Sequence, residues 1–203
     1  MSTDKTPDKR TVDMRIISEW IEPNSSVLDL GCGRGVFLEY LIKTKSVFGV
    51  GVDWDLDKVR SCIKRGVPAY QGDLAELMKS FPDKFFDRVV CSRTVQELNN
   101  PSSVLLEALR LADAVTVGFL NYGHWRNRLH HLMTGNHILT EANPHEWHEA
   151  RPTHPISITE FETFCVRNNI TVTRRVYLGG DWETPSKRWH NLLCGYAIFE
   201  MKQ

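Results

Sequence analysis

The sequence has no paired-cysteine motif and no long apolar run. Its five cysteines form no CxxC pair, and their odd number argues against a disulfide framework and for a reducing compartment. No run reaches the about 18 apolar residues that a membrane-spanning helix needs. The polar start MSTDKTPDKR also lacks the apolar segment of a secretion signal. These absences predict a cytoplasmic protein without a membrane partner.

The sequence also lacks an excess of charge of either sign. Its 25 lysines and arginines balance 25 aspartates and glutamates, so the formal net charge is +0 at pH 7. A protein without a long-range positive field does not attract nucleic acid electrostatically. The short basic stretch RNRLHH (126–131) is interpreted as a solvated helix face. We therefore expect a small-molecule ligand and no nucleic-acid partner.

Apolar runs of strand length alternate with segments of helical spacing along the 203 residues. Five parallel strands are expected over 26–30, 46–53, 67–70, 85–92 and 113–120. Two final strands, near 170–178 and 192–201, have no helical spacing between them, so one should run antiparallel. The expected fold is α/β, a three-layer, doubly wound, mostly parallel sheet with an antiparallel last strand. Residues 1–12 are expected to be a disordered tail before a single domain over 13–203.

The stretch VLDLGCGRGV (27–36) places three glycines at alternate positions directly after the first strand. In a doubly wound sheet, ligands bind at the carboxyl ends of the strands, where glycine permits positive φ and a close approach of the backbone. A dinucleotide fingerprint would need a glycine at position 36, which is Val36, and no Lys-Ser/Thr pair follows as in a triphosphate-binding loop. The spacing therefore points away from both of these ligands.

The DLGCGRG run (29–35) resembles the first motif of class I S-adenosylmethionine (SAM) methyltransferases. The resemblance extends to Asp53, which closes the second strand and would accept hydrogen bonds from a ribose diol, and to Trp54, which would lie against adenine. It further extends to QGDL (71–74) and FDRVVCS (86–92). It implies SAM or S-adenosylhomocysteine as the cofactor, bound by Asp29, Gly31, Cys32, Gly33, Gly35, Asp53, Trp54, Gly72, Asp73, Leu74 and Ser92.

Each of these residues also has a structural interpretation. Asp53 alone could be a turn or helix-capping residue, with Asp55 an equally good cap, and Trp54 alone could serve packing. Asp73 could cap the helix that is expected to begin at Leu74. We favour cofactor binding because four sites agree in order and spacing at the strand ends of one sheet. A relic of the fold that binds no ligand is the less favoured alternative.

A methyltransferase also needs groups that position a methyl acceptor and, for hydroxyl or carbon acids, a general base. The candidates follow the fifth strand or lie in the long segment 134–157. They are Asn121, Tyr122, His124 and Glu146. The histidines of HEWH (145–148) are three apart beside a proline, whereas a zinc-binding helix needs them four apart, so no metal site is expected.

Longer segments resemble one family more specifically. FLNYGHWRNRL (119–129), EWHEA (146–150), CIKRGVPAYQGDL (62–74) and the segment 13–35 are similar to the methionine biosynthesis protein MetW family. The resemblance implies a SAM-binding fold that acts in methionine biosynthesis as a partner or regulator of homoserine O-acyltransferase. A catalytically active SAM-dependent methyltransferase acting on a small molecule is the alternative.

Overall fold

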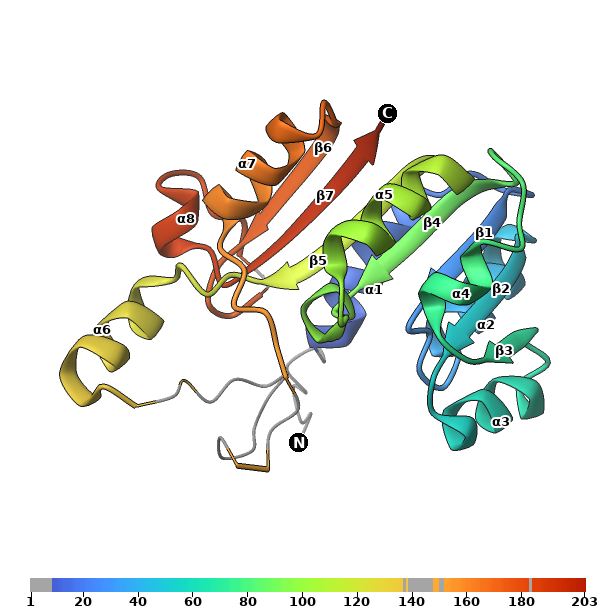
Figure 1. Cartoon of the computed structure of the whole chain (residues 1–203), viewed down its shortest axis with the longest axis horizontal. Helices are drawn as coiled ribbons and strands as arrows, with labels where there is room; N and C mark the ends of the chain where they lie inside the picture. Colours follow the sequence, from blue (N-terminus) through green and yellow to red (C-terminus); the bar gives the residue numbers. More distant parts are fainter. Residues whose placement is uncertain (1–8, 137, 139–147, 150–151, 183) are drawn as a thin grey trace, which may run out of the picture.

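The computed structural model describes residues 9–136, 138, 148–149, 152–182 and 184–203, and its described strands form one seven-stranded sheet (Figure 1). The order is β3-β2-β1-β4-β5-β7-β6. The bounds are β1 Ser26–Leu30, β2 Phe48–Asp53, β3 Ala69–Gln71, β4 Phe86–Ser92, β5 Ala112–Leu120, β6 Thr171–Leu178 and β7 Tyr196–Lys202. The first five strands pair in parallel, and β7 lies antiparallel between β5 and β6. The expected mostly parallel sheet with an antiparallel last strand is confirmed.

Helices cover both faces of this sheet and complete three layers. On one face, α1 Lys9–Glu19, α2 Val36–Lys45 and α3 Leu56–Lys64 pack against the sheet and form one apolar core. The other core packs α4 Leu74–Met78, α5 Pro101–Leu111 and α7 Ile158–Arg167 on the opposite face. The short helix η1 Val95–Glu97 follows β4, α6 Trp125–Thr134 follows β5, and α8 His190–Leu193 precedes β7. No helix in the described part of the chain is both long and apolar enough to cross a membrane.

Local sequence signals explain most helix ends. The side chain of Asn100 caps α5, Ser157 and Glu160 form a capping box at α7, and Gly66, with a φ of 77°, follows the end of α3. Asparagine and serine are favoured at helix starts, and glycine is favoured directly after a helix. Asn100 and Ser157 thus mark where the chain enters α5 and α7, and Gly66 marks where it leaves α3.

Two boundaries differ from the expectation. α1 begins at Lys9, inside the segment 1–12 that was expected to be a disordered tail, because Val12 and Asp13 are buried against the fold. Residues 1–8 lie outside the described part, so the division into a tail and one domain stays a prediction. The last strand begins at Tyr196 rather than near 192, because His190–Leu193 forms a helical turn that is too short to show a period in the sequence.

β7 has six consecutive buried residues, and one of them is charged. Glu200 is 2% exposed. Its carboxylate lies 2.7 Å from Nη1 of Arg88 on β4 and accepts a 2.7 Å hydrogen bond from Thr173 of β6. A buried charge without such partners would be strongly destabilising, so this triad fixes how β7 lies across the sheet.

We expect Glu200→Ala to lower the free energy of unfolding by about 3–5 kcal/mol, because it leaves the half-buried Arg88 without its carboxylate. Urea unfolding followed by circular dichroism measures this loss. Asp57→Ala breaks the exposed Arg60–Asp57 pair and should cost only about 0–1 kcal/mol. Equal losses for the two variants would contradict the role assigned to Glu200.

Candidate functional site

The loop between β1 and α2 is built from three glycines in the left-handed conformation. Gly31, Gly33 and Gly35 have φ values of 76°, 57° and 75°. A Cβ on Gly31 would collide with the side chain of Thr94, and one on Gly35 would lie 2.9 Å from the sulfur of Cys62. A Cβ on Gly33 would meet no heavy atom within 4 Å. The outer glycines thus allow tight packing, whereas Gly33 presents bare backbone to open space.

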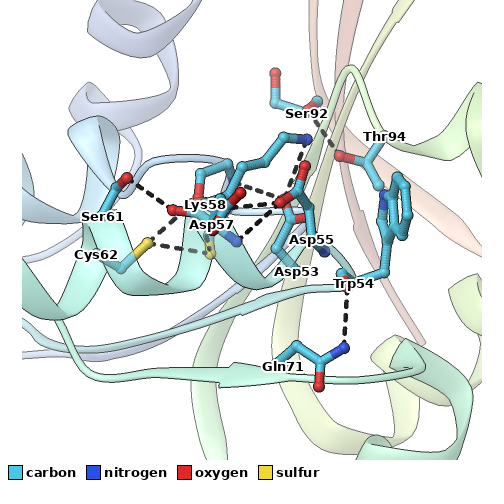
Figure 2. Close-up of polar contacts among 12 residues, drawn as sticks. Asp53, Trp54, Asp55, Asp57, Lys58, Ser61, Cys62, Gln71, Ser92 and Thr94 are labelled. Atoms are coloured by element: carbon cyan, nitrogen blue, oxygen red, sulfur yellow. Dashed lines mark hydrogen bonds and ion pairs between the residues drawn. The ribbon is translucent and has the colours of Figure 1, made fainter.

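The buried carboxylate of Asp53, at the end of β2, fastens this loop (Figure 2). One oxygen, Oδ2, accepts the Gly33 N–H at 3.0 Å and lies 3.7 Å from the Lys58 ammonium. Oδ1 accepts the N–H of Asp55 at 3.0 Å. Each carboxylate oxygen has two lone pairs, so Oδ1 keeps one for a further donor. Asp53 therefore has the turn role considered for it, and Asp55 is the residue that caps α3.

Asp29 of β1 contributes a second buried carboxylate beside Asp53. It is 6% exposed, and no group in the described part of the chain hydrogen-bonds to its side chain. Burial, followed by the neighbouring charge of Asp53, raises the pKa of Asp29 to about 7. A cation placed near Asp29 would stabilise its ionised form.

The residues expected to hold adenine lie at the ends of β2 and β3. Trp54 is 56% exposed, and its carbonyl accepts a hydrogen bond from the side chain of Gln71. Gly72 donates its N–H to the carbonyl of Asp53. Asp73 caps α4, whose first residue is Leu74, by accepting two backbone N–H bonds. The structure thus gives Asp73 the capping role and brings Gly72 next to Asp53.

Ser92, at the end of β4, belongs to a buried polar cluster that the sequence did not reveal. Its hydroxyl lies 3.0 Å from the hydroxyl of Tyr196 and 3.3 Å from the carboxylate of Asp13. Arg93 donates to the same carboxylate at 2.7 Å, and its guanidinium lies 4.7 Å from the ring centroid of Trp182. These residues come from widely separated positions in the chain, so no local spacing could have indicated the cluster.

Cys32 lies in the glycine loop with its sulfur 3.8 Å from that of Cys62 on α3. Both thiols are buried, and burial raises the pKa of each above its ordinary value, so they stay protonated at neutral pH. Cys32 therefore packs the loop against α3, and only its backbone is available to line the site.

Asn121, a candidate for acceptor chemistry, is 1% exposed and fully hydrogen-bonded. Its amide nitrogen donates to the carbonyls of Asn191 and Cys194, and its oxygen accepts the N–H groups of Gly123 and Ile158. These four bonds tie the end of β5 to α7 and α8. The neighbouring Tyr122 is half-buried.

His124 caps α6 through its ring, because Nδ1 accepts the N–H of Arg126 at 3.4 Å. Burial and the charge of Arg126 lower the pKa of His124, so the ring is neutral at pH 7. With Nδ1 accepting, the ring hydrogen lies on Nε2. Glu146, the remaining candidate, lies outside the described residues, as does His145 of the HEWH stretch.

Solved structures define the class of this fold. A SAM-dependent methyltransferase from Archaeoglobus fulgidus superposes with a TM-score of 0.69 at 17% identity, over 97% of this chain and 95% of its own. One from Clostridium acetobutylicum gives 0.65 at 13% identity, over 98% and 92%. The chain therefore has the Rossmann-like fold of class I SAM-dependent methyltransferases.

The family model of methionine biosynthesis protein MetW matches residues 11–201, so the chain belongs to the MetW family. A curated relative, the bifunctional methionine biosynthesis protein MetXA/MetW of Rhodopirellula baltica, is 26% identical over 175 residues. The alignment covers 82% of this chain but only 28% of that relative. The chain thus corresponds to a minor part of the bifunctional protein.

We expect the raised pKa of Asp29 to make the protein lose stability as the pH rises. The folded state holds the Asp29 proton up to about pH 7, whereas the unfolded state releases it near pH 4. The free energy of unfolding should therefore fall across this interval, by about 1.4 kcal/mol for each pH unit between the two pKa values.

Asp29→Asn should remove this fall and be more stable than the wild type at pH 8. Urea unfolding at pH 4.5 and pH 8 tests the expectation, with the exposed Asp113→Asn as control. Superimposable pH profiles for Asp29→Asn and the wild type would contradict the assignment.

Proposed function

We propose that the chain binds SAM or S-adenosylhomocysteine at the glycine loop and acts in methionine biosynthesis as a partner or regulator of homoserine O-acyltransferase. The observation that carries the cofactor assignment is the open backbone of Gly33, whose N–H is held by the buried carboxylate of Asp53. Membership of the MetW family and the class I methyltransferase fold support the same ligand.

The chemistry of these residues fits the cofactor group by group. The second lone pair of Asp53 Oδ1 would accept a ribose hydroxyl, while the glycine backbone allows the ligand to approach without a Cβ in the way. SAM is a sulfonium methyl donor that also carries an α-ammonium group, and Asp29 would face this positive charge. The exposed ring of Trp54 would lie against adenine, and Asp73, Gly72 and Leu74 would line the same end.

The partner role is supported by the relative in which MetXA and MetW are joined in one protein. Proteins fused in one organism and separate in another often act together, and the MetW resemblance names homoserine O-acyltransferase as the partner. The hydrogen bonds of the residues after β5 support a role in which the chain does not catalyse a reaction. Asn121 has its polar atoms committed to the backbone, and His124 uses Nδ1 as a helix cap, so neither is free as a general base. This favours the partner role over an active methyltransferase.

We expect Gly33→Ala to weaken SAM binding by on the order of tenfold or more, because the new methyl group occupies the space that the cofactor needs. Gly66→Ala is a matched control, since Gly66 also has positive φ and no atom within 4 Å of a Cβ. Both variants should lose about 1–2 kcal/mol of stability through the left-handed backbone. Calorimetric titration with SAM and with S-adenosylhomocysteine measures the affinities. Equal affinities in the two variants, or no binding to the wild type at millimolar ligand, would refute the site.

The proposed partnership predicts that the purified chain comigrates with the homoserine O-acyltransferase of the same organism in size-exclusion chromatography. SAM should change the acylation rate only if the free and bound forms of the chain bind the enzyme differently. Methyl-labelled SAM incubated with a metabolite extract tests the alternative in parallel. Labelled product without any effect on the acyltransferase would favour the methyltransferase and exclude the partner role.

A further inference from the structure

Helix α6 differs from the other long helices because none of its residues is buried. Figure 1 shows it projecting away from the sheet. Its large apolar side chains are nevertheless set at helical spacing, at positions i, i+4, i+7 and i+8, which places them on one face. They are Trp125 at 41% exposed, Leu129 at 45%, Leu132 at 83% and Met133 at 74%. An amphipathic helix normally buries such a face, so this face is built to be covered.

The segment around α8 adds two more exposed apolar side chains. Trp189, directly before α8, is 73% exposed, and Leu193 is 42% exposed. Arg128 of α6 lines the same cavity, of about 420 Å³, as Trp189 and Leu192, so the two helices border one hollow. We call the set Trp125, Leu129, Leu132, Met133, Trp189 and Leu193 the α6–α8 surface. Large apolar side chains that are exposed on neighbouring elements mark interaction sites.

The polar groups around the surface specify the chemistry of what covers it. α6 carries Arg126, Arg128, His130 and His131 and no acidic residue. A fitting partner therefore has an apolar patch with a carboxylate-bearing rim.

We infer that the α6–α8 surface is the docking face for the acyltransferase subunit, an inference that rests on the proposed partnership. In the bifunctional relative, the matched segment is only 28% of the protein, so most of that chain lies outside the MetW-like part and is available to cover such a face. Stable interfaces have an apolar core with a polar rim and are enriched in tryptophan and arginine. The surface offers two exposed tryptophans flanked by two arginines.

Asn121 joins the α6–α8 surface to the carboxyl edge of the sheet. Its side chain bonds the carbonyl of Asn191 in α8 and the N–H of Ile158 in α7, while its backbone continues β5. A partner that shifts α8 would therefore act on the strand end that lies next to the cluster around Ser92. This gives docking a physical connection to the cofactor side of the fold.

The test compares Leu132→Glu/Met133→Glu with Ile63→Glu, which places a charge at a 62% exposed apolar position on α3. The full chain is titrated with purified homoserine O-acyltransferase by calorimetry. The double variant should bind at least about tenfold more weakly than the wild type, and Ile63→Glu within about twofold of it. Circular dichroism and SAM titration should be unchanged in both variants, which excludes misfolding.

The outcomes separate the two proposals. If the wild type binds the acyltransferase and the double variant binds equally well, the docking face is wrong while the partnership stands. If the wild type does not bind, both fail. Size-exclusion chromatography of the chain alone and sedimentation with anionic vesicles complete the design. A further outcome is that the wild type forms a dimer or binds vesicles, and that the double variant abolishes this while its affinity for the acyltransferase is unchanged. That result assigns the α6–α8 surface to a second copy or to a lipid surface, and it overturns the inference.

Discussion

The hydrogen bond from the Gly33 amide to the Asp53 carboxylate is the constraint on which the candidate site depends. It joins the loop after β1 to the end of β2, so the two strand ends present one surface. The bond requires the left-handed backbone that glycine adopts freely at this position. The same conformation leaves Gly33 without a side chain on its open side. Together with the N–H groups of Gly31 and Cys32, which donate to the carbonyl of Val52, this contact holds the loop against β2 and leaves Gly33 accessible.

The two buried carboxylates of the site differ in how many neighbouring groups stabilise their negative charge. Asp53 has two backbone donors and the Lys58 ammonium nearby, whereas Asp29 has burial and a like charge. A fold selected for stability alone would pair Asp29 or replace it, because an uncompensated buried carboxylate is destabilising. Local departures of this kind are typical of functional sites, and a ligand with one positive charge, as in the proposed function, would supply this compensation.

Local patterns in the sequence were sufficient for much of the fold and for part of the site. β1 has the expected bounds, and α5 begins directly after the Asn100 cap, because apolar spacing and capping are encoded within a few residues. The position of Asp53 also followed from its place at a strand end. Lys58 beside Asp53, and Arg93 on Asp13, could not be predicted, because these pairings arise from how helices pack on the sheet. The open space at Gly33, in contrast to Gly31, also depends on tertiary neighbours.

Asn121 shows how tertiary packing engages a residue whose type suits acceptor chemistry. An amide at the end of β5 suits acceptor chemistry, yet this one is buried and commits its donors and acceptor to α7, α8 and its own turn. Because its side chain is held by four hydrogen bonds, a movement of α7 or α8 would also move Asn121. The same bonds leave it little freedom to form new ones with a substrate. Two binding events influence each other only through states of the protein that differ in structure or flexibility. If the proposed function holds, Asn121 is therefore better placed to link the cofactor side with a protein partner than to transfer a proton.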